Sequence, residues 1–470
     1  MSEGAVGPAE YRARVAEALA SGARVASLYA STDAEQPVVR AVLVLPGGAL
    51  RCETVGVLDG RAPSIVDLAP AAEWAEREAH DLHGTGFDGH EPLRPLAEHT
   101  ADLSGWTVPV TGSGVYQIAV GPVHAGVIES GHFRFHVVGD RILHLDVRLF
   151  YKHRGLERAA CGVPIDDGIA YAARACGACA VTNRVAYAHA AEGLGGRRAT
   201  PEVARARTLL LELERLWNHL NDIAAVCSGA GLAAGNQRFA ALCEEARRLN
   251  ADLTGHRLLF DSVHVGGSRL MIDDDRRRAA RGVLTRLRAA TAAAWRELLF
   301  NASFQDRLVD VGVLACADAI AWGAVGPAAR ASGIAEDARA DGDGRLAYDD
   351  FRPVLGERAA GDVRARLEQR ELELAQTFEL LDRLLEAPLA PGACAADGPP
   401  RESAVTRVES PRGATVCALE RSGDRVGRLH LRTGSYANWP VLARVVPGDL
   451  LPDFPLVNKS FELCYACADR

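Results

Sequence analysis

The stretch "ARARTLLLELERLWNHLNDIAAVC", residues 204–227, decides the fold class of this chain. Its apolar side chains recur at spacings of three and four residues, which places them along one face of an α-helix. Comparable stripes run through residues 239–253 and 363–385. Because each such helix must bury its apolar face against another element, the middle of the chain is predicted to be a helical bundle.

Two β-hairpins are predicted outside this helical middle. Residues 38–58 contain two β-branched runs joined by a Pro-Gly-Gly turn, and residues 414–434 contain a second pair joined by Ser-Gly-Asp. A helix is expected over residues 71–83, ended by Gly84. A turn-rich segment with little periodicity follows, so a domain boundary is placed near residue 105.

The predicted fold class is therefore α+β, in two domains. A small N-terminal α/β domain, residues 1–105, precedes a mainly helical bundle domain with peripheral β-hairpins, residues 106–470. A chain of 470 residues has ample length for two domains of this kind.

Composition and charge exclude several classes of protein. The chain is 48% hydrophobic with a formal net charge of -8, which is typical of a globular protein and argues against nucleic-acid binding. No window comes near the roughly 18 uninterrupted apolar residues of a spanning helix. The N-terminus has no basic region followed by an apolar one, so export is not expected. Any membrane contact is expected to come through partners.

The spacing of the cysteines is the most informative chemical feature. Cys176 and Cys179 form one Cys-x-x-Cys pair ahead of a segment of helical composition, where a helix N-terminus favours the metal-binding thiolate. Cys464 and Cys467 form a second pair near residue 470. Together they offer four sulfurs for one metal site, if the fold brings the two pairs together.

Other interpretations of the cysteines remain open. Either pair alone could be a redox pair, a structural zinc site or a chance occurrence, although a local zinc ribbon usually has only about 15–20 residues between its two pairs. The remaining cysteines stand singly and most are expected to be buried as small hydrophobic residues. They are Cys52, Cys161, Cys227, Cys243, Cys316, Cys394 and Cys417.

The segments around both pairs resemble the large subunit of nickel-iron hydrogenases. "RACGAC" (174–179) and "LCYACADR" (463–470) resemble its two cysteine motifs, and "YKHRGLERAACG" (151–162) and "LLLELERLWNHLNDIA" (209–224) resemble the energy-converting, group 4 enzymes such as formate hydrogenlyase. Residues 73–96 resemble the small hydrophilic subunit of respiratory complex I. Formate hydrogenlyase large subunits carry this part fused ahead of a part that is similar to the quinone-site large subunit of complex I.

This resemblance implies a set of site residues. Cys176, Cys179, Cys464 and Cys467 would hold a nickel-iron centre with CO and cyanide ligands on iron, and complex I subunits lack these cysteines. In "HRGLE" the resemblance assigns a proton-relay role to Glu157, whose alternative is a carboxylate at a helix start. In "ESPRG" it assigns an electrostatic role beside the diatomic ligands to Arg412, whose alternative is a surface turn.

The implied function is that of a catalytic large subunit of a membrane-associated nickel-iron hydrogenase complex, which reduces protons or oxidises H2. Electrons are expected to pass through an iron-sulfur small subunit, because the single cysteines show no cluster spacing and no iron-sulfur cluster is expected in this chain. The chain is expected in the cytoplasm, attached through membrane-arm subunits to the cytoplasmic face of the inner membrane. The main alternative is a complex I-like, NADH-quinone oxidoreductase-type connecting subunit that reduces quinone or couples electron flow without H2 chemistry. A third is a structural zinc or inert thiol site in an assembly scaffold.

Three positions next to the cysteines depart from the family pattern, apart from His83 in the N-terminal motif, where phenylalanine is typical. Asn183 stands where histidine is usual, and Glu462 and Leu463 stand where Asp-Pro is usual. Asparagine can still donate a hydrogen bond to sulfur, and glutamate keeps the charge of aspartate on a longer arm. The departures therefore bear on H2 turnover more than on the fold. Hydrogenase precursors typically extend past the second motif, and the position of Arg470 is that expected after a tail is removed or where none is encoded.

Overall fold

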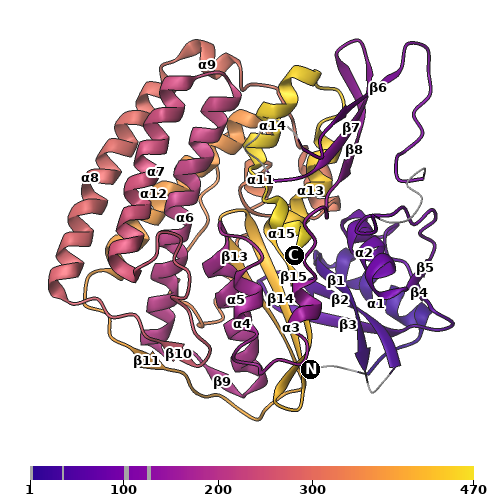
Figure 1. Ribbon diagram of the computed structural model, residues 1–470, viewed down its shortest axis with the longest axis horizontal. Coiled ribbons are helices and arrows are strands. Elements are labelled where there is room, and N and C mark those ends of the chain that lie inside the picture. Colours follow the sequence, from indigo (N-terminus) through magenta and orange to yellow (C-terminus); the bar gives the residue numbers. More distant parts are fainter. Residues whose placement is uncertain (1–3, 34–35, 100–104, 124–128) are drawn as a thin grey trace.

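The computed structural model describes residues 4–33, 36–99, 105–123 and 129–470. A small N-terminal unit lies beside a larger helical body, and three-stranded sheets occur in both (Figure 1). The predicted α+β fold class is confirmed. The predicted boundary near residue 105 borders residues outside the described ranges, and the division into two domains stays a prediction.

The N-terminal unit is built on an antiparallel sheet in the order β1 (Arg24–Asp33), β2 (Gln36–Val44) and β3 (Leu50–Gly56). The predicted Pro-Gly-Gly turn joins β2 to β3. Helices α1 (Pro8–Ala20) and α2 (Glu73–His83) pack on this sheet around a separate apolar core. As expected, α2 ends at Gly84, which has the left-handed φ of 69° that glycine adopts without strain.

Four long helices form the bundle of the larger body, on the left of Figure 1. They are α6 (Pro201–Gly229), α7 (Ala233–Thr254), α8 (Asp274–Leu299) and α12 (Val363–Leu384). Helix α6 contacts both α7 and α12 and is buried over nearly its whole circumference, including most of its polar side chains. Its polar face is therefore available for a buried site and does not face solvent.

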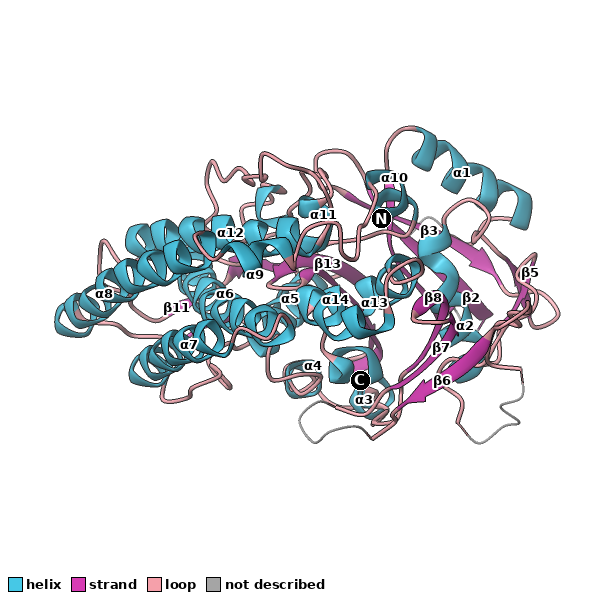
Figure 2. Ribbon diagram, turned by 90° about the horizontal axis from the view of Figure 1, so that it is seen from above, coloured by secondary structure: helices cyan, strands magenta, loops and turns pink. Residues whose placement is uncertain are grey.

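A second antiparallel sheet lies inside the molecule. It consists of β13 (Ser403–Ser410), β14 (Gly413–Ser422) and β15 (Arg425–Arg432), with the predicted Ser-Gly-Asp turn between β14 and β15. Helix α5 (Ala180–Leu194) packs on β13 and β14. Figure 2 shows this sheet enclosed between the helices and the N-terminal unit.

Both faces of β14 are apolar, which explains why this hairpin lies deeper than the expected peripheral position. Val416 and Ala418 contact the N-terminal sheet, while Cys417 and Leu419 join the core of the helical body. Alternating residues of a strand point to opposite faces, so a strand that is apolar on both must be covered twice.

The third sheet and the C-terminal segment complete the body. Strands β6 (Tyr116–Val120), β7 (His132–Val138) and β8 (Arg141–Arg148) form a peripheral antiparallel sheet. Helix α13 (Gly434–Val445) packs on β8, and the short α15 (Tyr465–Asp469) packs on α13. The C-terminal segment thereby runs through the interior.

The remaining elements are short. They are α3 (Leu156–Ala160), α4 (Ile169–Ala173), α9 (Ala302–Asp306), α10 (Cys316–Ala321), α11 (Gly326–Ala331), α14 (Phe454–Phe461), β4 (Arg61–Pro63), β5 (Gly86–Asp88), β9 (Arg197–Arg198), β10 (Gly267–Ser268), β11 (Gly392–Ala393), β12 (Ala395–Ala396) and three 3-10 turns, Pro70–Ala72, Ala338–Ala340 and Leu451–Asp453. Within the described ranges, no helix combines the length and the apolar character needed to cross a bilayer.

Candidate metal centre

Four cysteine thiols from two distant parts of the chain meet in the interior. Cys176 and Cys179 lie in the turn before α5, and Cys464 and Cys467 lie at the start of α15 and within it. Their Sγ atoms all lie within 4.8 Å of one another. Four soft donors this close together can surround one transition-metal ion.

The polar face of α6 fixes the turn that carries the first pair. Glu214 accepts hydrogen bonds from the backbone N–H groups of Val181 (2.7 Å) and Thr182 (3.1 Å), so it caps the N-terminus of α5. The Thr182 hydroxyl donates to the same carboxylate at 2.6 Å. One turn further along α6, the Asn218 amide donates to the Ala178 carbonyl at 2.8 Å. Helix α6 thus holds the end of this turn and the start of α5.

Side chains from two other segments hold the second pair. The Cys464 N–H donates to the Ser435 hydroxyl at 3.0 Å, and the Thr433 hydroxyl donates to the Cys467 carbonyl at 3.2 Å. Between the two cysteines, the Ala466 N–H donates to the Glu129 carboxylate at 2.6 Å. The backbone on both sides of each thiol is therefore fixed.

Arg412 lies beside the thiols and is 4% exposed. Its guanidinium donates to Asn218 Oδ1 at 2.7 Å, to Asp222 Oδ1 at 2.8 Å and to the Glu462 carbonyl at 2.9 Å. Burial alone would lower the pKa of Arg412, but the negative charges of Asp222 and of the nearby Cys464 outweigh it and raise the pKa above its ordinary value. The side chain is a fixed cation, and the alternative of a surface arginine is wrong.

Two glycines leave the space that the backbone of Arg412 occupies. A Cβ atom on Gly326, which has a φ of 67°, would lie 2.6 Å from the Arg412 carbonyl oxygen. A Cβ on Gly434 would lie 2.9 Å from the same atom. Larger residues at either position would displace the turn that carries the guanidinium.

The four thiols share their negative charge unevenly. Hydrogen bonds from the thiols of Cys176, Cys179 and Cys467, with the charge of Arg412, lower the pKa of Cys464 well below its usual range. The pKa values of Cys179 and Cys467 lie well above theirs, first because of hydrogen bonding with Cys176. Among these three thiols, Cys464 is therefore the one that is most readily ionised. This donor set fits a soft metal cation.

The three departures from the family pattern all lie next to the cluster. Asn183 is fully buried one turn after Cys179, and neither atom of its amide has a hydrogen-bond partner among the described residues. Burial, and then the charge of Asp222, raise the pKa of Glu462 to about 8. Leu463 is buried against the apolar core. The three positions flank the cysteine pairs in the chain, and none of them replaces a thiol.

Glu157 lies in a separate cluster of ion pairs. Its carboxylate accepts hydrogen bonds from Arg470 (2.8 Å), Arg428 (3.0 Å) and the Leu431 N–H (2.8 Å). Among the described residues, no hydrogen bond joins this carboxylate to any of the four clustered thiols. Burial would raise the pKa of Glu157, but the charges of Arg470, His430 and Arg428 outweigh this effect and hold the pKa well below its usual range. The Arg470 guanidinium also pairs with Glu78, so it fills the centre of the Glu78, Glu157 and His430 group. The relay role of Glu157 stays a prediction.

The single cysteines are less uniformly buried than expected. Cys227, Cys243 and Cys417 are buried, whereas Cys161 and Cys316 are exposed, which corrects the expectation for these two. Both exposed residues lie on or beside short surface helices, where a thiol has no apolar pocket to enter.

Two families of known proteins match parts of the chain. The family described as respiratory-chain NADH dehydrogenase, 30 Kd subunit, matches residues 9–107, and that described as the 49 Kd subunit matches residues 239–399 and 392–470. Formate hydrogenlyase subunit 5 of Escherichia coli (strain K12) is 30% identical over 442 residues, covering 87% of this chain and 77% of that protein. The chain belongs to the family of formate hydrogenlyase-type hydrogenase large subunits.

A second hydrogenase and one solved structure are also similar to the chain. The carbon monoxide-induced hydrogenase of Rhodospirillum rubrum is 30% identical over 361 residues, covering 76% of this chain and 99% of that protein. A chain in the structure of the membrane-bound sulfane sulfur reductase, an archaeal respiratory membrane complex, has a TM-score of 0.70 at 26% identity, covering 77% of this chain and all of that one. The resemblance stated from the sequence is confirmed, and the complex I-like alternative remains compatible with the matching families.

Proposed function

We propose that this member of the hydrogenase family is the catalytic large subunit of a membrane-associated nickel-iron hydrogenase complex, which reduces protons to H2 or oxidises H2. The observation that carries the proposal is the group of four thiols within 4.8 Å of one another. Thiolates are the soft ligands that nickel would accept, and all four would be available to hold the metal centre.

In this proposal Cys176, Cys179, Cys464 and Cys467 bind the metals, and CO and cyanide complete the ligands of iron. When bound, the centre would supply the redox chemistry that interconverts H2 with two protons and two electrons. The chain itself supplies orientation: Glu214 and the Ser435 hydroxyl hold the backbone of the two thiol-bearing turns.

Arg412 is proposed to hold a permanent positive charge beside the bound group. Three of its five N–H groups are used by Asn218, Asp222 and Glu462. The remaining ones can donate to anionic ligands such as cyanide. A buried, pre-oriented cation of this kind stabilises negative charge more strongly than one in water.

Glu157 is proposed as a proton relay, with a condition set by its partners. Because Arg470 and Arg428 hold it as a carboxylate, Glu157 can take up a proton only when one of these ion pairs opens. Proton passage through Glu157 would therefore be coupled to movement of Arg470, three positions after Cys467.

Partner subunits are proposed to supply the electrons and the membrane attachment. Among the described residues, only one group of clustered cysteines occurs, so an iron-sulfur small subunit is proposed to deliver the electrons. Membrane-arm subunits are proposed to attach the complex to the cytoplasmic face of the inner membrane. Residues 1–105 are proposed as the docking domain and 106–470 as the catalytic domain.

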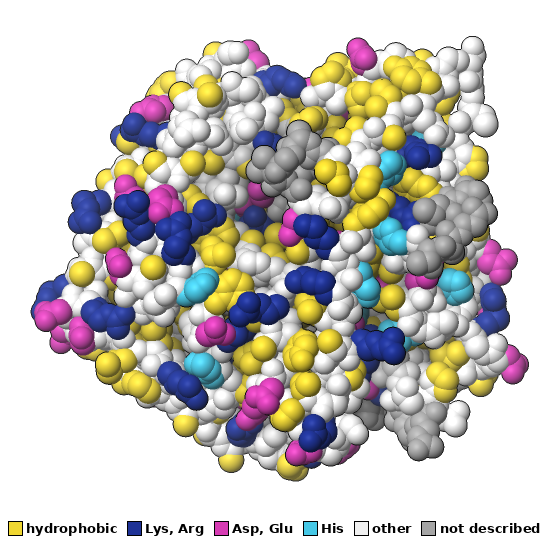
Figure 3. Space-filling model, in the orientation of Figure 1, with side chains coloured by type: hydrophobic (Ala, Val, Ile, Leu, Met, Phe, Trp, Pro, Cys, Tyr) yellow, Lys and Arg dark blue, Asp and Glu magenta, His cyan; other side chains and the backbone are white. Residues whose placement is uncertain are grey.

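Hydrophobic side chains gather over β6–β8 in the upper right of Figure 3. The exposed large hydrophobic side chains of these strands are Tyr116, Val138 and Leu143, which suit a protein contact.

The alternative function is that of a complex I-like subunit that reduces quinone. It is favoured by the two matching NADH dehydrogenase families. It assigns no role to the four thiols.

Isotope exchange separates the two functions without an artificial electron donor. The complex, purified with its maturation partners, is incubated with D2 in ordinary water, and HD is followed by mass spectrometry. A nickel-iron hydrogenase splits D2 heterolytically and releases HD. Quinone reduction without HD formation would replace the hydrogenase proposal with the alternative.

A further inference from the structure

A small cavity lies between the N-terminal unit and the enclosed sheet. Arg24 at the start of β1, Arg407 in β13 and Arg432 at the end of β15 line it together with Glu336 and several small apolar side chains. Its volume is about 10 Å³. This is room for about one water molecule or one ion of similar size.

The side chain of Arg432 makes no direct hydrogen bond or ion pair with any residue that the structure describes, and the residue is 4% exposed. Its Nη2 atom lies 3.7 Å from the Cβ position of Gly323, on the wall of the cavity. An unpaired buried guanidinium is costly, because its desolvation is not offset by hydrogen bonds or an opposite charge.

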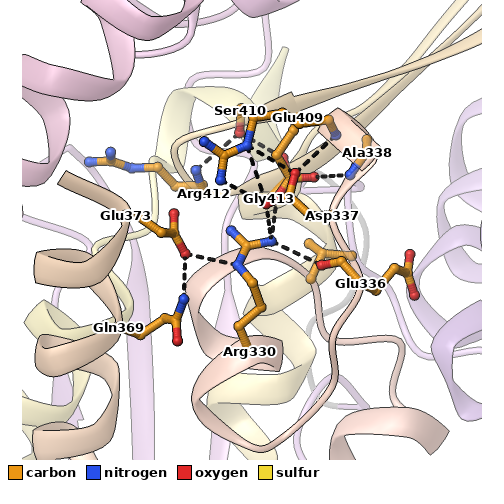
Figure 4. A network of polar contacts seen from close by, with 12 residues as sticks. Arg330, Glu336, Asp337, Ala338, Gln369, Glu373, Glu409, Ser410, Arg412 and Gly413 are labelled. Carbon is orange, nitrogen blue, oxygen red and sulfur yellow. Dashed lines mark hydrogen bonds and ion pairs between the residues drawn. The ribbon is translucent and has the colours of Figure 1, made fainter. Parts of the chain in front are cut away.

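The neighbouring carboxylates are committed to the other two arginines. Glu336 pairs with Arg24 at 2.5 Å and with Arg407, and Asp341 pairs with Arg407 at 2.9 Å. Figure 4 shows that the Glu336 carboxylate points away from Arg330. Arg330 instead forms ion pairs with Glu373 and Glu409. The three guanidinium groups that line the cavity are thus matched by two carboxylates, Glu336 on its wall and Asp341 behind Arg407, which leaves an excess of one positive charge.

The electrostatic surroundings of Arg432 agree with this count. Burial is the first cause that lowers the pKa of Arg432, to about 10. The positive charges of Arg24 and Arg407 also lower it, and the negative charge of Glu336 offsets only part of these effects. The nearby Tyr436 is a neutral phenol, whose own pKa burial raises well above its usual value, so it supplies no counter-charge.

We propose that this cavity binds a single small monovalent anion, chloride, between the guanidinium groups of Arg24, Arg407 and Arg432. One such ion balances the excess charge and fits the volume, whereas phosphate and sulfate are too large for a space of one water molecule. Since Arg24 belongs to the N-terminal unit and the other two to the enclosed sheet, the ion also bridges the two parts of the chain. Chloride therefore stabilises their association.

Bromide diffraction and chloride-dependent melting test this site. Crystals of the full chain in its complex are grown with bromide replacing chloride, and anomalous scattering locates the ion. In parallel, the melting temperature is measured in potassium chloride and in potassium gluconate of equal ionic strength. The site predicts an anomalous peak in contact with the Arg432 guanidinium and a saturable rise of the melting temperature in chloride.

Two variants make the melting experiment specific. Arg432→Gln should lose the chloride-dependent rise, whereas Arg401→Gln, at an exposed arginine, should keep it. An equal rise in Arg432→Gln, or no peak at the cavity, would overturn the proposal. A peak only at very high bromide, without a chloride effect on melting, would mark an adventitious ion and would also overturn it. If Arg432→Gln does not fold, the bromide peak in the unaltered protein decides.

Discussion

Arg470 donates a hydrogen bond of 2.8 Å to the carboxylate of Glu157, and the same guanidinium pairs with Glu78 of α2. Arg470 lies three positions after Cys467. The segment that carries two of the four thiols is therefore anchored both to α3 and to the N-terminal unit. Formation of the thiol cluster and association of the N-terminal unit are linked through one buried side chain.

Removal of this anchor should destabilise the protein strongly. In Arg470→Gln, Glu78 and Glu157 would be left as buried carboxylates without their shared cation, which typically costs about 3–5 kcal/mol. The free energy of unfolding, from denaturant titration, is expected to fall by this amount. Arg401→Gln at an exposed arginine serves as the control and should change it by less than about 0.5 kcal/mol. Equal stability of the two variants would contradict the anchoring role.

The pH dependence of stability should report the state of Glu157. Its pKa in the folded chain lies well below the unfolded value of about 4.3. Its stabilising contribution is therefore present above that unfolded value and is lost as the pH falls through the lower folded pKa. Glu157→Gln should flatten the loss of stability below about pH 4, while Glu379→Gln, at an exposed glutamate of α12, should not. An unchanged acid slope in Glu157→Gln would refute this assignment.

Cys464→Ser should remove metal chemistry while leaving the fold intact. The substitution takes away one soft ligand and almost no core volume. We expect loss of nickel and of HD formation, with an unchanged circular dichroism spectrum. Cys161→Ser, at an exposed single cysteine, should retain both metal and activity. Retained H2 evolution in Cys464→Ser would contradict the proposed ligand set.

Glu214 should prove to be a positioning residue for the first thiol pair. Glu214→Ala leaves the N–H groups of Val181 and Thr182 buried without acceptors, at about 1–3 kcal/mol each. The turn with Cys176 and Cys179 should loosen, so metal content should fall and the infrared bands of any remaining centre should broaden. Glu379→Ala is the matched control on α12. Full metal content with unchanged bands in Glu214→Ala would assign Glu214 a purely structural role.

Much of this arrangement could be predicted from local sequence patterns. The apolar residues spaced three and four apart in residues 204–227 predicted helix α6. The two Cys-x-x-Cys pairs predicted which four thiols form the cluster. Glu214, Asn218 and Asp222 recur every four residues on α6, and this polar ridge was a detectable signal for the groups that hold the first turn and Arg412. It was obscured by the apolar stripe of the same helix.

Other parts of the site left no local signal. Glu129 and Ser435 contact the second thiol pair from segments far from it in the chain, and their spacing carries no periodicity. The charge excess at Arg432 likewise arises only when β1 and β15 are brought together. Such long-range pairings depend on the fold as a whole, so they follow from the structure and not from the sequence pattern.

Metal analysis combined with infrared spectroscopy of the complex, purified with its maturation partners, tests the central claim most directly. If the four thiols hold a nickel-iron centre, the complex will contain nickel, and its infrared spectrum will show bands of bound carbon monoxide and cyanide that disappear in Cys464→Ser. Zinc alone, or no metal in a fully assembled complex, would contradict the proposed hydrogenase centre.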